Sequence, residues 1–381
     1  MPAWRPILEG ERAERARELV GWLAERLIDP SGIEPGRAAT LMSGLPGVAL
    51  ALDAVGDEAR AGEHLEAAAA ASGTLAGEAG LARGVAGLAF AFELCDGGSS
   101  EGGDDPNDAI DEALAAEVGG DPTVPAELMR GLAGRAVFAR ERRARPSGRA
   151  LEEAITGRLL AMAEATAEGT AWRTAPDPRF ADRTLCERHP QGWFDLGVAH
   201  GAPAIIAALA GIGGPGADAA RAGMDWIWRQ RGPAGGPGFP ALAGEEPRAQ
   251  PGWCYGDEGL AAVLFAVARA LGDDAWSGRW LEVLRGAAER GAPASGAALC
   301  HGAAGLAHIY NRVHQETGLD WARSAALTRF AELEAALADS RERLPAGLLD
   351  GLAGVALALA AALGDEEPAW DRALVLSLRP G

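Results

Sequence analysis

Two cysteines and a histidine are the residues of this 381-residue chain that are best suited to metal chemistry. Cys254 lies in the sequence Gly-Trp-Cys-Tyr-Gly-Asp, and Cys300 and His301 lie in Leu-Cys-His-Gly. Each cysteine stands two residues before the first glycine of a Gly-x-x-Gly motif, so both occupy the same position of a repeat. Two thiolates and one imidazole suit one Zn²⁺ ion, and three protein ligands leave a fourth position open, which is typical of catalytic zinc sites.

The Gly-x-x-Gly motif recurs along the whole chain, and a polar residue precedes every copy. The motifs begin at Gly44, Gly84, Gly131, Gly201 (with Ala204 in place of the second glycine), Gly256, Gly302 and Gly351. The residues before them are Ser43, Arg83, Arg130, His200, Tyr255, His301 and Asp350. A purely structural repeat would not need polarity at these positions. We therefore expect these seven side chains to line one rim of the fold.

The elements that must position this rim are two kinds of helix. Most copies of the motif open a segment that is apolar on nearly every side, as in residues 352–363, and such a helix is buried on every side. Longer amphipathic segments with charged faces lie between the motifs, for example residues 11–27 and 321–338. The pattern predicts an all-α fold of seven outer and seven inner helices in a single domain, residues 1–381. Because an open solenoid would expose its inner helices, we expect a closed α/α toroid.

Two stretches interrupt this rhythm. Residues 95–124 include an acidic, glycine-rich connector, and residues 170–195 are rich in Pro, Trp and Thr. We expect a solvated connector in the first and a small irregular or β insertion in the second.

The composition excludes several classes of function. All 35 basic residues are arginines, and without lysine the chain cannot form a Schiff base or a phosphate loop that ends in Lys-Ser or Lys-Thr. The net charge of −19 opposes binding to nucleic acid or to anionic membranes. The apolar segment 352–363 is too short for a membrane span, and four scattered cysteines do not make a disulfide framework. We expect a cytoplasmic protein with reduced thiols.

Three motifs together resemble the lanthionine synthetase C family of cyclases. They are Trp-Cys-Tyr-Gly from Trp253, Cys-His-Gly from Cys300 and Leu-Gly-Val-Ala-His-Gly from Leu196, and the resemblance covers essentially the whole chain. It implies a zinc enzyme that adds a Cys thiol of a precursor peptide to dehydroalanine or dehydrobutyrine and so forms lanthionine or methyllanthionine rings. The implied partners are a dehydrated precursor peptide and a separate dehydratase.

The same resemblance assigns roles to individual residues. It implies that Cys254, Cys300 and His301 bind the zinc, whose fourth ligand is water or the substrate thiolate, and that His200 is the acid/base. This chemistry is coherent, because attack on the β-carbon leaves an enolate that must gain a proton, and a histidine titrates near neutral pH.

The chain departs from the family pattern in two places. Glu127 stands where the family commonly has Asp, and Gln250 stands where it often has Arg before Trp-Cys-Tyr-Gly. Glu127 could replace the Asp, but a positive charge for the enolate would have to come from Arg248, Arg83 or Arg130. Further rim residues that could contact the substrate are Tyr255, Asp257 and Asp350.

Three other functions remain open at the level of sequence. A relative of the same family could add glutathione or another thiol to dehydrated residues, and a non-catalytic toroid could use zinc to capture a peptide. A zinc-dependent prenyltransferase is disfavoured, because its metal site normally includes a carboxylate and the best one here, Asp257, follows Cys254 by three residues.

Overall fold

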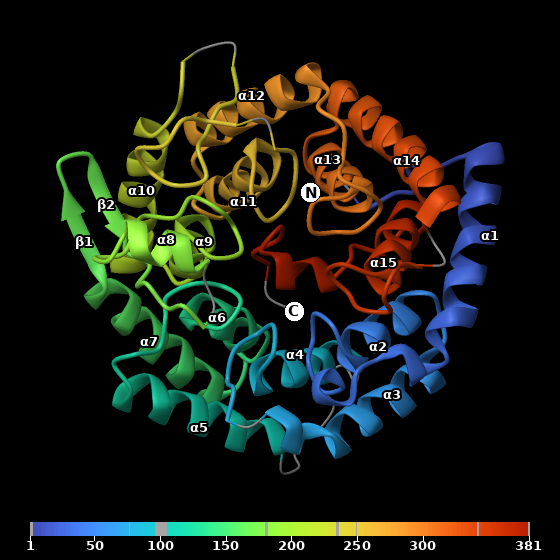
Figure 1. Cartoon of the computed structure of the whole chain (residues 1–381), viewed down its shortest axis with the longest axis horizontal. Helices are drawn as coiled ribbons and strands as arrows, with labels where there is room; N and C mark the ends of the chain where they lie inside the picture. The colour runs from blue at the N-terminus through green and yellow to red at the C-terminus, as the bar shows by residue number, and fades with distance from the viewer. Residues whose placement is uncertain are drawn as a thin grey trace.

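In the computed structural model, two concentric rings of helices surround a central axis (Figure 1). The structure describes residues 3–75, 77–95, 105–179, 182–233, 236–248, 250–340 and 343–379. The outer ring consists of α1 (Gly10–Leu27), α3 (Glu58–Ala70), α5 (Pro106–Gly120), α7 (Pro146–Ala161), α10 (Gly214–Arg229), α12 (Asp274–Arg290) and α14 (Asp320–Ser340). The inner ring consists of α2 (Leu45–Ala54), α4 (Val85–Cys95), α6 (Leu132–Glu141), α9 (Ala202–Ala210), α11 (Asp257–Ala270), α13 (Ala303–Thr317) and α15 (Leu352–Leu363). The all-α toroid with seven outer and seven inner helices is confirmed for the described residues.

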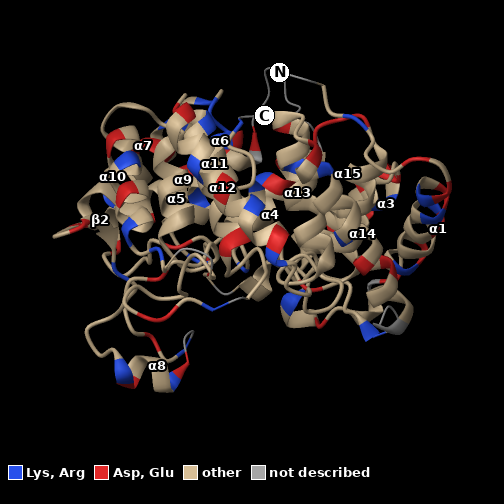
Figure 2. Cartoon of the chain, turned by 90° about the horizontal axis from the view of Figure 1, so that it is seen from above, with Lys and Arg blue, Asp and Glu red and all other residues tan. Residues whose placement is uncertain are grey.

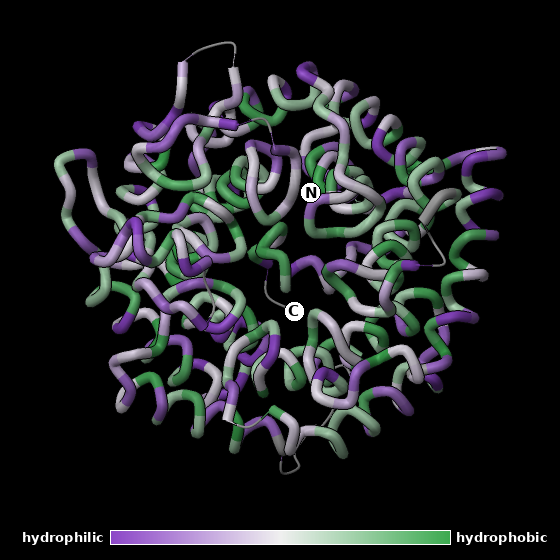
Figure 3. Tube along the Cα trace, in the orientation of Figure 1, coloured by the Kyte–Doolittle hydropathy of each residue, from purple (hydrophilic) through white to green (hydrophobic). Residues whose placement is uncertain are grey.

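Hydropathy explains which helices lie inside. Every residue of α9 is buried, whereas α1 buries only Ala13, Ala16, Leu23 and Leu27 on one face. The inner ring is accordingly more hydrophobic than the outer ring along the chain trace (Figure 3). The ring closes where α15 packs against both α1 and α2, so the last repeat contacts the first.

The two irregular stretches contain regular structure. An antiparallel hairpin of β1 (Ala163–Thr166) and β2 (Gly169–Trp172) precedes α8 (Arg183–Arg188), which stands apart from the body of the toroid (Figure 2). The predicted insertion is therefore present but starts before residue 170. The stretch 95–124 contains the outer helix α5, and the acidic residues 96–104 lie outside the described residues.

The glycines of the motif serve a local purpose. A side chain at Gly87 would overlap the carbonyl of Leu81 in the same loop and the side chain of Leu41 in the preceding repeat. Glycine at this position lets the loop fold back onto the start of its own helix and against the neighbouring loop.

The bore of the toroid is filled by the C-terminal segment, residues 364–379, which includes a 3₁₀ helix at Trp370–Leu374 (Figure 1). Trp253 Nε1 donates a hydrogen bond of 2.9 Å to the carbonyl of Leu374. Further down the bore, His308 Nε2 lies 2.9 Å from Asp371 Oδ2, and Arg312 Nη2 donates to the same oxygen at 2.6 Å. His308 is thus a fully buried core residue that contacts this segment through Nε2, whereas its Nδ1 has no hydrogen-bond partner among the described residues.

Replacing Asp371 with alanine tests how strongly this segment is held. Asp371 and His308 are fully buried and Arg312 nearly so, and the substitution leaves a buried guanidinium without its main counter-charge. We expect the free energy of unfolding in urea to fall by about 3–5 kcal/mol. The control is Glu289→Ala, which breaks an exposed pair with Arg285 and should cost no more than about 0.5 kcal/mol. Equal, small losses in both variants would show that the buried pair does not hold the segment.

Candidate metal centre and acid/base pair

The loops that precede the inner helices are joined by backbone hydrogen bonds at equivalent positions. Five such bonds link Ala82 N to Met129 O (2.8 Å), Met42 N to Ala82 O (3.3 Å), Leu349 N to Met42 O (3.1 Å), Cys300 N to Leu349 O (3.0 Å) and Cys254 N to Cys300 O (3.2 Å). A further bond of 2.8 Å runs to Cys254 O from Val198 N, one residue before the equivalent position of its own loop. Equivalent residues of distant repeats therefore lie side by side around one mouth of the toroid. Cys254 and Cys300 belong to neighbouring loops of this circle.

The circle brings the three metal-binding candidates together. The ligand atoms of Cys254, Cys300 and His301 all lie within 4.8 Å of one another. Cys300 and His301 are consecutive but can reach one point because they lie in the loop before α13 and not within the helix. A tetrahedral zinc ion would hold such atoms roughly 3.4–3.8 Å apart, so small side-chain rotations would complete the site. The residues present therefore fit a zinc ion in both donor type and spacing.

The charges of this cluster also fit a cation. Contact with the Cys300 thiol and the nearby His301 lower the pKa of Cys254 to about 6, although burial opposes this. Contact with Cys254, together with burial, raises the pKa of Cys300, because two adjacent thiols cannot both ionise without a compensating charge. A divalent ion supplies that charge and allows both cysteines to be thiolates.

His200 and Glu127 form a hydrogen-bonded pair on the same mouth. His200 Nδ1 lies 2.9 Å from Glu127 Oε2. The Glu127 carboxylate is fixed in turn, because it accepts hydrogen bonds from the backbone N–H groups of Met129 (3.0 Å) and Arg130 (2.8 Å). Glu127 is buried, whereas the His200 side chain is 41% exposed. This arrangement orients the imidazole through Nδ1 and leaves Nε2 to exchange protons with a ligand.

The surroundings of His200 favour its protonated form. Burial alone would lower the pKa, but the hydrogen bond and charge of Glu127, with the charge of Asp195, outweigh it and raise the pKa above the usual value. His200 therefore keeps its proton to a higher pH than a free histidine does.

Asp195 is a site residue that the sequence analysis missed. Its buried carboxylate accepts a hydrogen bond of 2.9 Å from the Tyr255 hydroxyl and one of 2.8 Å from the Gly197 backbone N–H. Glycine is required at 197 because a side chain there would overlap the Tyr255 ring. Burial and Asp195 raise the pKa of Tyr255, which stays neutral. The only signal in the sequence is an Asp five residues before the His of the Ala-His-Gly motif.

The arginines predicted near the rim differ in their surroundings. Arg130 is about one-fifth exposed, and its Nε lies 3.6 Å from a Glu127 oxygen. Arg83 is exposed, as is Asp350, which precedes the last motif. Arg248 is also exposed and lines small cavities together with Gln250, one of which Tyr255 also lines. Of these arginines, Arg130 is the one that the structure places in contact with the His200–Glu127 pair.

The Asp257 side chain makes contacts that hold two segments of the fold together. Its buried carboxylate accepts hydrogen bonds from the backbone N–H groups of Gly238 (2.7 Å) and Phe239 (3.0 Å), and it pairs with Arg290. These contacts hold the loop between α10 and α11 against the start of α11, so the oxygens are already engaged.

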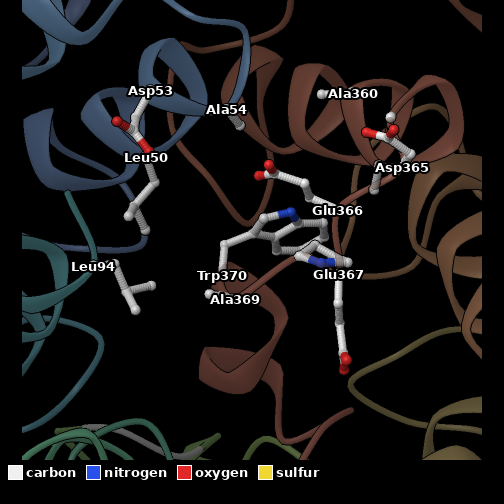
Figure 4. A pocket seen from close by; sticks show the side chains of 13 residues that line it. Leu50, Asp53, Ala54, Leu94, Ala360, Asp365, Glu366, Glu367, Ala369 and Trp370 are labelled. Atoms are coloured by element: carbon white, nitrogen blue, oxygen red, sulfur yellow. The ribbon is translucent and has the colours of Figure 1, made fainter. Parts of the chain in front are cut away.

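Two cavities lie at opposite ends of the inner helices. The larger, about 530 Å³, is lined by Glu127 and Arg130 on the mouth described above. The other, about 350 Å³, lies at the C-terminal ends of α2, α4 and α15 beside Trp370, with Asp53, Asp365 and Glu366 around it (Figure 4). Only the larger of the two adjoins the acid/base pair.

Replacing Glu127 with glutamine should lower the pKa of His200, because it removes the negative charge that favours the imidazolium. In the wild-type protein, the pair stabilises the fold below pH ~6.5, and this stabilisation is lost as pH rises through the raised pKa of His200 in the folded state. Because Glu127→Gln lowers that pKa, it should also reduce this stabilisation. An NMR titration of the His200 ring measures the change directly. Glu78→Gln alters another carboxylate of the same cavity and is the control. An unchanged His200 pKa in Glu127→Gln would show that the hydrogen bond does not set it.

Together the fold and this site define an α/α toroid with a Cys₂His cluster at one mouth. The chain belongs to the lanthionine synthetase C-like protein family, whose model matches residues 37–375. It is also similar to the solved structure of nisin cyclase, with a TM-score of 0.72 and 17% identity over 95% of this chain and 97% of that chain. No match was found among curated proteins. None of the described helices has the length and apolar character needed to cross a membrane.

Proposed function

We propose that this protein is a zinc-dependent lanthipeptide cyclase, which adds Cys thiols of a precursor peptide to dehydroalanine or dehydrobutyrine and forms thioether rings. The observation that carries the proposal is the placement of Cys254, Cys300 and His301 on the same mouth as the His200–Glu127 pair. A metal ion held by the cysteines and His301 would bind the nucleophile, and a protonated histidine on the same mouth would supply an acid. Family membership and the nisin cyclase-like fold support this function.

In this proposal, the Cys₂His cluster activates the thiol and the His200–Glu127 pair supplies the proton. A zinc ion held by Cys254, Cys300 and His301 would lower the pKa of a substrate thiol well below its free value of about 8.5. The sulfur forms a bond to the β-carbon of the dehydro residue, and the electron pair of the double bond moves to the α-carbon and its carbonyl. His200 then gives its proton to the α-carbon, and it recovers a proton from the next thiol. Atoms and charges balance over one cycle, and the peptide keeps its mass.

Other residues keep His200 in the required state. Glu127 holds the imidazole by Nδ1, and the charge of Asp195 adds to the stabilisation of the imidazolium. We assign the stabilisation of the developing enolate to Arg130, because among the predicted arginines it is the one in contact with this pair.

The decisive experiment incubates the zinc-loaded protein with a dehydrated, Cys-containing precursor peptide. Because ring closure leaves the mass unchanged, free thiols are trapped with an alkylating agent and counted by mass spectrometry. Loss of alkylation that depends on zinc and on Cys254 supports a cyclase. A peptide that gains the mass of glutathione when glutathione is added, while its own thiols remain open to alkylation, indicates the alternative of a thiol-adding family relative. Thiols that persist with several candidate peptides, despite tight peptide binding, indicate a binding protein without cyclase activity.

A further inference from the structure

The C-terminal segment in the bore reaches the loop that carries Cys254 (Figure 1). Trp253, the residue before this cysteine, is fully buried, and its Nε1 donates a hydrogen bond of 2.9 Å to the carbonyl of Leu374. The backbone N–H of Trp253 donates at 2.7 Å to the carbonyl of Cys300, which also accepts a bond of 3.2 Å from Cys254 N. Trp253 therefore joins the C-terminal segment to the loops of both cysteines of the cluster.

The turn that presents this carbonyl has a strained backbone. Val375 has φ 50° and ψ 28°, and it is the one residue other than glycine with a positive φ among the described residues. Its N–H bonds to the carbonyl of Arg372, and the N–H of Leu376 bonds to the carbonyl of Asp371. These two bonds form a Schellman motif, in which the left-handed residue is usually glycine. A β-branched residue keeps such a conformation only where the surrounding structure enforces it.

Burial and a buried ion pair enforce the turn. Residues 374–376 are at most 3% exposed, and the Asp371 carboxylate holds the start of the turn through its pair with Arg312. The hydrogen bonds of the turn itself use the carbonyls of residues 371 and 372, which leaves the carbonyl of Leu374 to bind Trp253. The acceptor of the indole N–H is therefore fixed in place, and the strain shows that packing sets its position against the local preference of the chain.

We propose that the turn at residues 374–375 is a structural part of the metal centre and that Trp253 is a positioning residue, which holds the Cys254 loop against the Cys300 loop at the spacing one metal ion requires. Without the indole hydrogen bond, the Cys254 loop is freer to move, and metal binding must also order it, which weakens the affinity. The inference rests on the proposed function for the presence of a metal, but it concerns metal affinity and needs no peptide substrate.

The test measures the metal affinity of the full-length protein. Metal-free protein is titrated with Co²⁺ in competition with a chelator, because Co²⁺ binds such sites more weakly than Zn²⁺ and its absorption bands report the geometry of the site. Trp253→Phe keeps a large apolar ring but removes the donor. We expect it to weaken Co²⁺ binding by about tenfold, the lower end of the ~10–100-fold that loss of a residue supporting a metal ligand costs, and to change the absorption bands.

Trp172→Phe is the matched control. Trp172 is also buried, and its Nε1 donates a hydrogen bond of the same length, 2.9 Å, to the carbonyl of Leu159 in α7. The variant loses the same kind of bond elsewhere in the fold, so it should lower the melting temperature to a similar degree and leave the Co²⁺ affinity and the absorption bands unchanged. If Trp253 had only a structural role, the two variants would bind Co²⁺ equally well.

A second measurement decides the case should Trp253→Phe fail to fold. If the indole hydrogen bond strengthens metal binding, metal binding must strengthen the hydrogen bond by the same factor. Exchange of the Trp253 Nε1 hydrogen with solvent can be followed by NMR in protein labelled with ¹⁵N-tryptophan. Addition of zinc should slow this exchange by about tenfold more than it slows the exchange at Trp172.

Two results would overturn the inference. They are equal Co²⁺ affinities in Trp253→Phe and Trp172→Phe, and an exchange rate at Trp253 that zinc slows no more than the rate at Trp172. Failure of the proposed function has a different signature, because the wild-type protein itself would then bind neither Co²⁺ nor zinc.

Discussion

Replacing Cys254 with alanine should remove both the bound zinc and the ring-forming activity. A zinc site with two remaining ligands, one of them the exposed His301, loses a thiolate charge and the tetrahedral arrangement. Removal of residues that merely support a metal ligand costs 10–100-fold in affinity or activity, so loss of a ligand should cost more than about 100-fold. Metal analysis after dialysis gives the zinc content, and the alkylation assay gives the activity.

The design separates loss of a ligand from loss of a thiol in general. Cys300→Ala should behave as Cys254→Ala does, because the two cysteines hold equivalent positions in neighbouring loops. Cys186→Ala removes a cysteine of α8 and should retain full zinc content and activity. Circular dichroism checks that the toroid is intact in all three. Stoichiometric zinc in both Cys254→Ala and Cys300→Ala would refute the proposed ligand set.

The repeat explains why so much of the site could be predicted. Periodicity alone placed Cys254 and Cys300 at the same position, and a closed ring of repeats has to bring equivalent positions to one mouth. The backbone hydrogen bond from Cys254 N to Cys300 O joins these two equivalent positions directly. The same reasoning placed His200 on the rim, and the structure brings it against Glu127.

Features that break the repeat could not be predicted in this way. Asp195 acts through its contact with Tyr255, which lies 60 residues away in the sequence, and no repeat position marks it. The C-terminal segment fills the bore through irregular contacts such as Trp253 with Leu374, which leave no period. The outer helix α5 was hidden because its acidic sequence follows a connector rich in glycine and aspartate.

Replacing His200 with asparagine should lower turnover by about 10²–10⁴-fold while leaving zinc bound. Asparagine can still donate a hydrogen bond to Glu127, so the loop should keep its shape, but it cannot deliver a proton to the α-carbon. The thiol would still be held, and peptide affinity should change little. The loss should therefore appear in kcat more than in KM.

The control for this variant is His314→Asn, which changes a histidine in the last turn of α13, away from the mouth, and should leave turnover intact.

The pH–rate profile gives a second test of His200. In His200→Asn, solvent protons can replace the imidazole only slowly, and their concentration falls as pH rises. The residual activity should therefore decrease steadily with pH, and the limb of the profile that the imidazole sets should be missing. In the wild-type protein that limb should fall at the raised pKa of His200, and Glu127→Gln should move it to lower pH. A turnover and pH profile identical to wild type in His200→Asn would leave the metal cluster as the sole catalytic element and would transfer the protonation step to water. Zinc content, peptide affinity and turnover should respond differently to the Cys254 and His200 substitutions, and that difference would distinguish an enzyme from a toroid that only captures peptides.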